Sequence, residues 1–329
     1  MCLGYWLLVI GYWLFCVMSE EVKSLSKVIV IVGPTASGKT DWGLRLAKKY
    51  NGEIIMADSR QVYKKMDIGT AKEPGEWKRI GLHKIFHIQD IPHHLVDFLD
   101  PGKFFTVTEF KSEAIKYIND AIKKGHTPIV AGGTGLYIHG LVDNLQVPKV
   151  APNKKLRDSL EKKSSDELMQ WLEKLDPVTA QTVDRLNKRR VVRALEVCMI
   201  SGIPFSEQQK KGEPLFNFLQ IGIEVPREVL FERINHRMDK MMQLGLLKEV
   251  ENLIKQKYSW DLPSLSGIGY RQFKPYFDGE ANLEQVVEWL KRDSRRYAKR
   301  QLTWFKRDPR IKWVTEYEEA EKLVEEFLK

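Results

Sequence analysis

Cysteine is scarce in this 329-residue sequence, which contains only Cys2, Cys16 and Cys198 and no Cys-x-x-Cys pair. Three separate cysteines cannot form a disulfide framework, and they do not supply the paired thiolates of a structural zinc site. The sequence is therefore not that of a disulfide-stapled secreted protein, and a reducing compartment is expected.

Glycine and proline are also modest in number, at 22 and 14 residues. These counts exclude collagen-like chains, and a hydrophobic content of 43% excludes intrinsic disorder. The 53 Lys and Arg outnumber the 44 Asp and Glu, which gives a formal net charge of +9. Such an excess indicates a polyanionic partner, either nucleic acid or an acidic membrane surface, and the length suits about two domains.

Four of the seven histidines lie close together, but they lack the spacing of a metal site. Pro92 interrupts the group, and no glutamate stands beside them in the spacing of a zinc protease. We expect structural or hydrogen-bonding roles for His83, His87, His93 and His94.

Residues 1–19 carry no charge and are rich in aromatic and aliphatic side chains. Eighteen residues of helix would span about 27 Å, close to the thickness of a hydrocarbon core. A secretory signal would place basic residues before the apolar run, whereas the first basic residue is Lys23. The alternative is that translation begins at Met18. We favour that alternative because the rest of the sequence has the features of a cytoplasmic protein.

From residue 27 onward, short apolar runs alternate with helical patterns. The run Val28–Val32 is β-branched throughout, as expected of a parallel strand that is buried on both faces. Further strands are predicted at 53–57, 95–98 and 128–131, with helices at 41–50 and 106–124. Strands that alternate with helices predict a parallel α/β sheet.

The first strand is followed by a phosphate-binding motif, because GPTASGKT matches G-x-x-x-x-G-K-[ST] in full between a strand and a helix. In such a P-loop, backbone N–H groups surround a phosphate and the following helix adds its positive end. Lys39 would neutralise phosphate oxygens, and the Thr40 hydroxyl would ligate Mg²⁺. The residues predicted to bind a di- or triphosphate are Gly33, Pro34, Thr35, Ala36, Ser37, Gly38, Lys39 and Thr40.

The pattern changes after about residue 141. Residues 152–201 are charged and helix-forming, sheet character returns at 216–225, and helices resume at 227–257 and 283–307. The predicted fold class is α/β, with a P-loop parallel-sheet core, an inserted and mostly helical domain, and a helical C-terminal region. The predicted parts are the extension 1–19, the first part of the core 20–141, the helical insertion 142–212, and the core completion with a basic helical region 213–329.

Two further polar positions follow predicted strands. Asp58 ends the second strand, where open α/β sheets place their ligands, and three roles are open to it: holding Mg²⁺, acting as a general base, or capping the next turn. Residues 132–135 (GGTG) follow another strand and bring the Thr134 hydroxyl to the same edge. We expect these groups and the P-loop to form walls of one pocket.

Seven segments of the chain resemble the tRNA dimethylallyltransferase family and occur in that family's order. The resemblance covers residues 27 to about 313, and only the apolar segment 1–19 departs from the pattern. The zinc finger that eukaryotic members carry after this region has no counterpart in the sequence. The segments are GPTASGKT (33–40), DSRQVYKKMDIGTAK (58–72), PHHLVD (92–97), AGGTGLY (131–137), RRVVRALEV (189–197), SGIGYRQ (266–272) and RRYAKRQLTW (295–304).

The resemblance implies transfer of a dimethylallyl group from dimethylallyl diphosphate to N6 of adenosine 37 in tRNAs that read codons beginning with U. Mg²⁺ near Thr40 is the implied cofactor. By match to the family motifs, Asp58 is the base that takes the N6 proton, Thr134 lies near the acceptor and the phosphates, and Arg237 contacts the diphosphate. The alternative is that Arg237 is a solvated side chain on the surface of the helix 227–244.

Binding of tRNA requires that the target base leave its stack and enter the pocket. Residues 291–307 carry eight Lys or Arg and one Asp, with Tyr297 and Trp304 among them, which favours RNA over a solvated face. The insertion would then close over the anticodon stem as one half of a clamp. The resemblance assigns tRNA contacts to Asp58, Ser59, Arg60, Gln61, Thr134, Arg157, Arg189, Arg190, Val191, Val192, Arg193, Ser266, Gly267, Ile268, Gly269, Tyr270 and Arg271.

The expected partners are the tRNA anticodon stem-loop and dimethylallyl diphosphate, and the expected state is a cytoplasmic monomer that needs no protein partner. Three other functions fit part of the sequence. A small-molecule kinase would need no basic second domain, and an isopentenyltransferase acting on free AMP, ADP or ATP would dispense with most of the tRNA clamp. An RNA-binding protein with a purely structural P-loop would not need Lys39, Thr40 and Asp58 together.

Overall fold

The computed structural model describes residues 25–81 and 83–329. The apolar segment 1–19, and with it the choice between a start at Met1 and a start at Met18, lies outside the described residues. No helix within the described part is long and apolar enough to cross a bilayer.

Eight strands of the described residues form one mixed sheet in the order β3-β4-β5-β2-β6-β1-β7-β8. The six strands from β5 to β8 in this order are parallel to their neighbours, as the alternation of strands and helices predicted. The hairpin β3-β4 adds two antiparallel strands at one edge. The strands are β1 (Lys27–Val32), β2 (Gly52–Met56), β3 (Glu76–Ile80), β4 (His83–Ile88), β5 (Ile91–His94), β6 (Thr127–Gly132), β7 (Asn217–Ile223) and β8 (Lys312–Val314).

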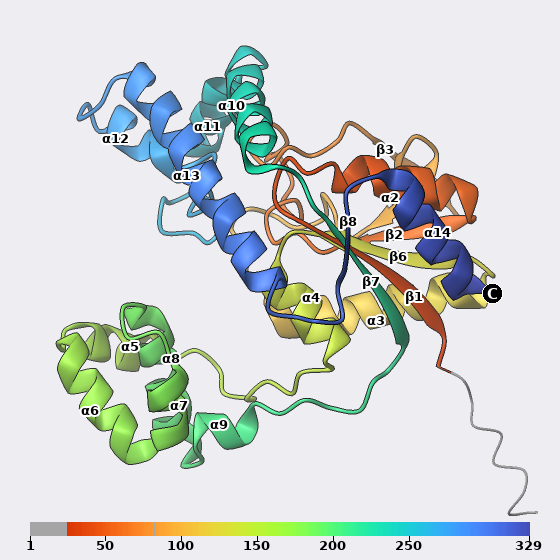
Figure 1. Cartoon of the computed structure of the whole chain (residues 1–329). Coiled ribbons are helices and arrows are strands. Elements are labelled where there is room, and N and C mark those ends of the chain that lie inside the picture. The colour runs from red at the N-terminus through yellow and green to blue at the C-terminus, as the bar shows by residue number, and fades with distance from the viewer. Residues whose placement is uncertain (1–24, 82) are drawn as a thin grey trace, which may run out of the picture.

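The helices fall into three groups (Figure 1). The core helices are α2 (Lys39–Lys49), α3 (Val107–Lys123), α4 (Gly135–Val142) and α14 (Tyr317–Leu328). The insertion contains α5 (Lys154–Glu161), α6 (Ser165–Leu175), α7 (Pro177–Thr182), α8 (Lys188–Ser201) and α9 (Phe205–Gln208). A third lobe contains α10 (Arg227–Gln243), α11 (Leu246–Lys255), the short α12 (Lys274–Phe277) and α13 (Leu283–Phe305).

Helices cover both faces of the sheet because alternate residues of its central strands point to opposite sides. The valines of β1 pack with α3 and α4, whereas its isoleucines pack with α2 and α14. All five side chains are fully buried, and burial of each contributes roughly 1.5–3 kcal/mol. The three-layer α/β core confirms the predicted fold class.

The strand predicted at 95–98 is wrong, because the strand in this region is β5 and it ends at His94. Leu95 and Asp97 have φ values of 60° and 54°, which lie in the left-handed region and cannot continue a strand. The backbone N–H of Asp97 instead donates to the carbonyl of Gln61 at 2.9 Å. The apolar residues of this segment therefore belong to a buried loop that packs beside the segment after β2.

The histidines of this region have structural contacts. His93 contacts the carbonyl of Ile91 through Nδ1 at 2.8 Å, and burial lowers its pKa to about 4. His94 pairs through Nε2 with the buried carboxylate of Glu53 at 2.6 Å. These contacts are of the hydrogen-bonding kind that the sequence predicted.

The insertion has an apolar core of its own, formed by leucine, valine and methionine side chains of α5, α6 and α8. Figure 1 shows it standing apart from the sheet at the end of two connecting segments. These segments are hydrogen-bonded to each other where they leave the core. Gln146 donates through its N–H to the carbonyl of Lys210 at 2.8 Å, and Gly212 donates to that of Asp143 at 3.2 Å.

The third lobe packs α10, α11 and α13 against the segment that follows β2. Val62, Tyr63 and Met66 from that segment share one buried cluster with residues of these helices and with Tyr270 and Phe273. The packing places α10 and α13 beside the carboxyl ends of β1 and β2, where α/β sheets bind their ligands.

Candidate active site

Three neighbouring strands bring the predicted catalytic groups to one edge of the sheet. The P-loop follows β1, Asp58 follows β2 and Thr134 follows β6, and β6 lies between the other two. Because parallel strands end at the same edge, residues that are far apart in the sequence meet there.

The P-loop has the backbone geometry of an anion cradle. Gly38, at the start of α2, has a φ of 97°, and Ala36 has a φ of 63°, a conformation that is uncommon for non-glycine residues. The hydroxyl of Ser37 is buried and has no hydrogen-bond partner among the described residues. Lys39 folds over its own loop, and its ammonium donates to the carbonyl of Pro34 at 2.6 Å.

Two desolvated cations lie at this loop. Burial lowers the pKa of Lys39 to about 8, against the opposing charge of Asp58 and with a further lowering by Arg237. Burial also lowers the pKa of Arg237, whose guanidinium donates to the Thr35 hydroxyl at 3.4 Å. Within the described residues, neither cation has a carboxylate at ion-pair distance. Half-buried, desolvated cations without a protein anion fit a site that receives a charged ligand.

Asp58 is oriented by the turn that follows it. Its Oδ1 accepts hydrogen bonds from the backbone N–H groups of Arg60 at 2.8 Å and Gln61 at 3.3 Å, so it does cap this turn. The second oxygen, Oδ2, has no hydrogen bond to any described residue, and Asp58 lines a cavity. The turn therefore fixes the carboxylate while it leaves one oxygen for a ligand.

Thr134 supports the same turn from the neighbouring strand. Its Oγ1 accepts from the N–H of Ser59 at 3.0 Å, and its own N–H donates to the carbonyl of Ala57 at 3.1 Å. Gln61 completes the support, because its side-chain amide donates to the carbonyls of Thr70 and Ala71. Thr134 and Gln61 thus act on the position of Asp58 in this structure.

The cavity in front of Asp58 has a volume of about 290 Å³, at the lower end of small-molecule sites. It brings together many residues predicted for catalysis or tRNA binding. Those that line it are Thr35, Asp58, Ser59, Arg60, Arg237, Ser266, Gly267, Ile268, Gly269 and Arg271. Tyr270 instead points into the apolar cluster, where its hydroxyl donates to Glu249 at 2.7 Å.

One wall of this cavity depends on two glycines that touch. Gly269 has a φ of 103°, and a Cβ built on it would lie 2.6 Å from the carbonyl oxygen of Gly69. A Cβ on Gly69 would lie 2.5 Å from the ring of Tyr270. The segments around 69 and 269 can approach this closely only because both positions lack a side chain.

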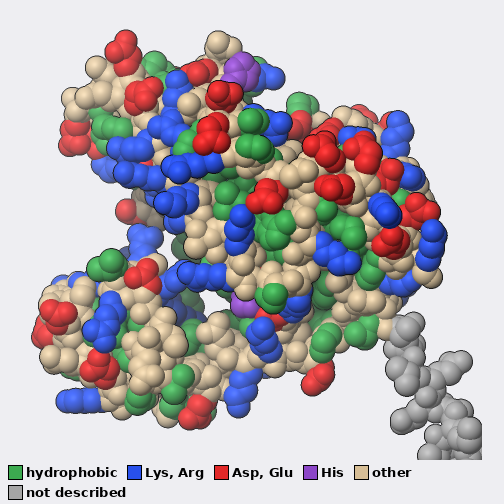
Figure 2. Space-filling model, in the orientation of Figure 1, with side chains coloured by type: hydrophobic (Ala, Val, Ile, Leu, Met, Phe, Trp, Pro, Cys, Tyr) green, Lys and Arg blue, Asp and Glu red, His purple; other side chains and the backbone are tan. Residues whose placement is uncertain are grey.

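The predicted tRNA contacts of the insertion lie on its own lobe, away from this cavity. Arg189 and Arg190 are exposed at the start of α8, whereas Val191 and Val192 belong to the buried core of the insertion. Figure 2 shows a deep notch between the insertion and the third lobe, with Lys and Arg side chains on both of its walls.

Arg157 and Arg193 have a structural partner. Arg157 donates two hydrogen bonds to the carboxylate of Glu196 at 2.8 and 2.7 Å, and Arg193 donates one at 2.5 Å. The Glu196 side chain is fully buried. The two arginines therefore neutralise a buried charge, and their tRNA contact stays a prediction.

Sequence reasoning used Tyr297 only as an aromatic residue of the basic segment that favours RNA, and it missed Gln301, which also lies on α13. Tyr297 lines the cavity, and burial together with the charge of Asp58 raises its pKa to about 12, so the phenol stays protonated. Gln301 contacts the P-loop. A signal was present, because Ser294, Ala298, Gln301 and Phe305 follow the spacing of the buried face of a helix.

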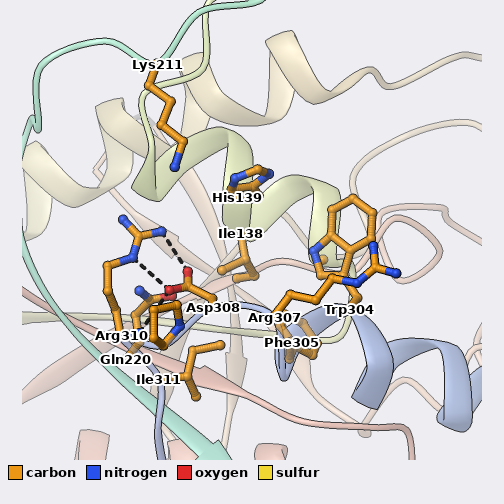
Figure 3. A pocket seen from close by; sticks show the side chains of 12 residues that line it. Ile138, His139, Lys211, Gln220, Trp304, Phe305, Arg307, Asp308, Arg310 and Ile311 are labelled. Atoms are coloured by element: carbon orange, nitrogen blue, oxygen red, sulfur yellow. Dashed lines mark hydrogen bonds and ion pairs between the residues drawn. The ribbon is translucent and has the colours of Figure 1, made fainter. Parts of the chain in front are cut away.

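A second, larger cavity of about 450 Å³ contains none of the predicted catalytic groups (Figure 3). His139, Lys211 and Arg310 line it, and all three contact the buried carboxylate of Asp143. Because Lys211 lies on the segment that returns from the insertion, this cluster joins that segment to the core.

Mg²⁺ would have few ligands from this chain. The described residues contain no group of three or more His, Cys, Asp or Glu that could hold a metal ion. At the P-loop the chain offers the hydroxyl of Thr40, at the start of α2. One hydroxyl fits Mg²⁺ as a partner of a bound diphosphate, since this ion keeps several waters and takes phosphate oxygens as ligands.

Comparison with known proteins agrees with this arrangement. Residues 61–308 match the IPP transferase family, and residues 26–89 match the isopentenyl transferase family. The chain is 43% identical to a tRNA dimethylallyltransferase of Acetivibrio thermocellus, over 91% of this chain and 96% of that protein. It is 42% identical to that of Carboxydothermus hydrogenoformans, over 92% and 96% of the two chains.

Two solved structures have the same fold. The tRNA isopentenylpyrophosphate transferase of Bacillus halodurans matches with a TM-score of 0.64 at 36% identity, over 92% of this chain and 95% of that one. A eukaryotic dimethylallyltransferase that acts on tRNA matches with a TM-score of 0.70 at 32% identity, over 85% and 69% of the two chains. The protein described here belongs to the tRNA dimethylallyltransferase family.

Proposed function

We propose that the protein transfers a dimethylallyl group from dimethylallyl diphosphate to N6 of adenosine 37 in tRNAs that read codons beginning with U. The observation that carries the proposal is the pair of desolvated cations, Lys39 and Arg237, beside the carboxylate of Asp58 at one edge of the sheet. A bound diphosphate would neutralise the two cations, and the carboxylate of Asp58 would accept the proton that the amine loses.

The reaction needs most help with its leaving group. The bond between C1 of the dimethylallyl group and the diphosphate oxygen breaks, and negative charge grows on the diphosphate. Backbone N–H groups of the P-loop, Lys39 and Arg237 are fixed before the reaction, so their stabilisation of this charge requires little reorganisation. Mg²⁺, held by Thr40 and the diphosphate, would supply further positive charge to the leaving oxygens.

The new bond forms between C1 and N6 of adenine, and N6 gives up one proton. Asp58 is the group that takes this proton, because Oδ1 is held by its turn and Oδ2 is open to the cavity. Thr134 keeps the carboxylate in place through Ser59. The neutral phenol of Tyr297 and the side chain of Arg60 line the space that the purine would occupy.

The tRNA would bind along the notch between the insertion and the third lobe. Arg296, Lys299 and Arg300 are exposed on α13, and Arg189 and Arg190 are exposed on α8. Phosphate contacts from both walls would hold the anticodon stem-loop while the base enters the cavity. A small-molecule kinase or an enzyme for free AMP would have no use for these two surfaces. We further propose that the enzyme acts as a monomer in the cytoplasm.

The test is transfer of label from radioactive dimethylallyl diphosphate in the presence of Mg²⁺. Three acceptors are compared: unmodified tRNA, the same tRNA with guanosine at position 37, and AMP or ATP. The proposal expects label in the first acceptor alone. Label in free nucleotide, or phosphate transfer from ATP, would contradict it.

A further inference from the structure

Helix α13 holds two loops of the site together through the amide of one buried side chain. Gln301 is 6% exposed, and its Oε1 accepts a hydrogen bond from the backbone N–H of Thr35 at 2.8 Å. Its Nε2 donates to the backbone carbonyl of Gly133, also at 2.8 Å. The side chain therefore joins the P-loop to the turn that follows β6. Thr35 and Gln301 are 266 residues apart in the sequence.

The surface of α13 fits this turn closely. A Cβ on Gly133 would lie 2.2 Å from Nε2 of Gln301, and a Cβ on Gly135 would lie 2.3 Å from the ring of Trp304. The helix and the turn leave no space for another side chain. A shift of the helix would therefore move the turn that holds Thr134, and through it the turn of Asp58.

The bond to Gln301 also decides which P-loop donors face a phosphate. Thr35 was among the residues predicted to bind the diphosphate, but its backbone N–H is already used inside the protein. The Thr35 hydroxyl accepts from Arg237 at the same point. Gln301 thus fixes Thr35 near the start of the loop, and the N–H groups that follow are left for the diphosphate.

The same part of α13 faces the nucleic acid. Tyr297, one turn before Gln301, and Arg300, directly before it, line the cavity, and Arg296 and Lys299 are exposed beside them. We propose that Gln301 is the positioning residue that sets the geometry of the P-loop, from the same helix that carries the RNA-facing residues. This inference rests on the proposed function for the identity of the two ligands.

The first test replaces Gln301 by alanine. Inorganic diphosphate should bind the free Gln301→Ala enzyme about tenfold more weakly than wild type, because two buried hydrogen bonds that order the loop are lost. An anticodon stem-loop RNA should bind within about twofold of wild type, because the exposed arginines are unchanged. Calorimetry measures the affinity for diphosphate, and fluorescence anisotropy measures the affinity for the RNA. Hydrogen exchange of residues 33–40 should become faster.

Val286→Ala is the matched control on the same helix. Val286 is fully buried in the third lobe and does not contact the P-loop. This change should lower the melting temperature and leave diphosphate affinity unchanged. Equal loss of diphosphate affinity in both variants would show a general effect of destabilising α13 and would overturn the inference.

A second test uses a change of a single atom. In Gln301→Glu, the protonated carboxyl can accept from Thr35 and donate to Gly133 as the amide does, whereas the ionised carboxylate repels the carbonyl of Gly133. Diphosphate affinity relative to wild type should therefore recover as the pH falls from 8 to about 5.5. Wild type is measured at each pH because Lys39, Asp58 and Arg237 also carry charge near the loop. A ratio that does not change with pH would contradict the inference.

A third test approaches the contact from the other side. Gly133→Ala would displace the amide of Gln301 and should weaken diphosphate binding to a similar degree. In the double variant with Gln301→Ala the clash is absent, so its loss should not exceed that of Gln301→Ala alone. Losses that add would show that the two residues act separately. Failure of wild type to bind diphosphate or to modify tRNA would instead contradict the proposed function.

Discussion

The core and the insertion treat buried charge in opposite ways. In the insertion, the carboxylate of Glu196 is fully buried and is bound by two arginines, so its charge is balanced within the fold. In the core, Lys39 and Arg237 are desolvated beside the P-loop without an ion-paired carboxylate among the described residues. A balanced buried charge needs no ligand and destabilises the fold when one partner is removed, whereas an unbalanced one is ready for a ligand.

This difference separates two kinds of arginine that look alike in the sequence. Arg157 and Arg193 were predicted to contact tRNA together with Arg189 and Arg190, yet only the latter two are exposed and without a carboxylate partner in the described structure. Substitutions can test the comparison, because those in the core should act on turnover and those in the insertion on stability or tRNA affinity.

The largest effect is expected for Asp58→Asn. The amide oxygen can still accept from Arg60 and Gln61, so the turn should keep its shape, but the side chain can no longer take the N6 proton. Turnover should fall by about 10²–10⁴, the usual contribution of a general base, with tRNA affinity nearly unchanged. Turnover is measured by single-turnover transfer, and tRNA affinity is measured by a binding titration. Unchanged turnover would exclude Asp58 as the base.

Glu196→Gln should destabilise the insertion and spare the core. The change leaves two arginines without their anion, which costs about 2 kcal/mol after allowance for their partial exposure of 37% and 29%. Native-state hydrogen exchange should show faster opening of α5 and α8, with β1 protected as in wild type. Equal loss of protection in β1 would mean that the two regions unfold together.

Charge reversal at Arg189 and Arg190 should act on tRNA alone. The double change should weaken tRNA binding by roughly tenfold at moderate salt and reduce the salt dependence of binding, since phosphate contacts are lost. Diphosphate affinity should be unchanged. The matched control reverses Lys116 and Lys123, which are exposed on the core helix α3. If the control weakens tRNA binding as much, the effect comes from net charge and the notch is not the binding surface.

The smallest effect is expected from pH. The pKa of Lys39 is lowered to about 8, so its ammonium is charged below pH 8 and is lost as the pH rises through that value. The kcat/KM for the donor should therefore fall by about eightfold between pH 7.5 and 9, because this ratio reports the free enzyme. A bound diphosphate stabilises the charged ammonium form of Lys39, so kcat should stay constant up to a higher pH than kcat/KM does. A flat kcat/KM profile would exclude a role for this charge.

Much of the core could be predicted from the sequence because its signals are local. The β-branched run of β1, the GPTASGKT motif and the polar residues after β2 and β6 each lie within a few residues. β3 was missed because most of it is exposed and its sequence, EWKRI, has no buried face. β4, its partner in the hairpin, was missed with it. The strand expected at 95–98 failed because positive φ values at Leu95 and Asp97 leave no trace in residue type.

The site could be predicted only in part, for a different reason. The motifs identify the P-loop and Asp58, but the supports of these groups come from distant segments. Gln301 meets Thr35 and Gly133 only through the path of α13, and the pairing of Arg157 and Arg193 with Glu196 depends on how α5 packs on α8. Residue type indicates which chemistry is present, whereas the contacts that orient it arise from tertiary packing.

The hydrogen bonds between the two connecting segments have a consequence for engineering. Gly212 donates through its N–H to the carbonyls of Asp143 and Asn144 at 3.2 and 3.3 Å, so the chain leaves the core and returns to it at nearly one point. A short turn joining 144 to 212 could replace the whole arm while every strand of the sheet is kept. Arms from relatives could be exchanged as cassettes on a constant prenyl-transferring body, which would let substrate choice be varied separately from the chemistry.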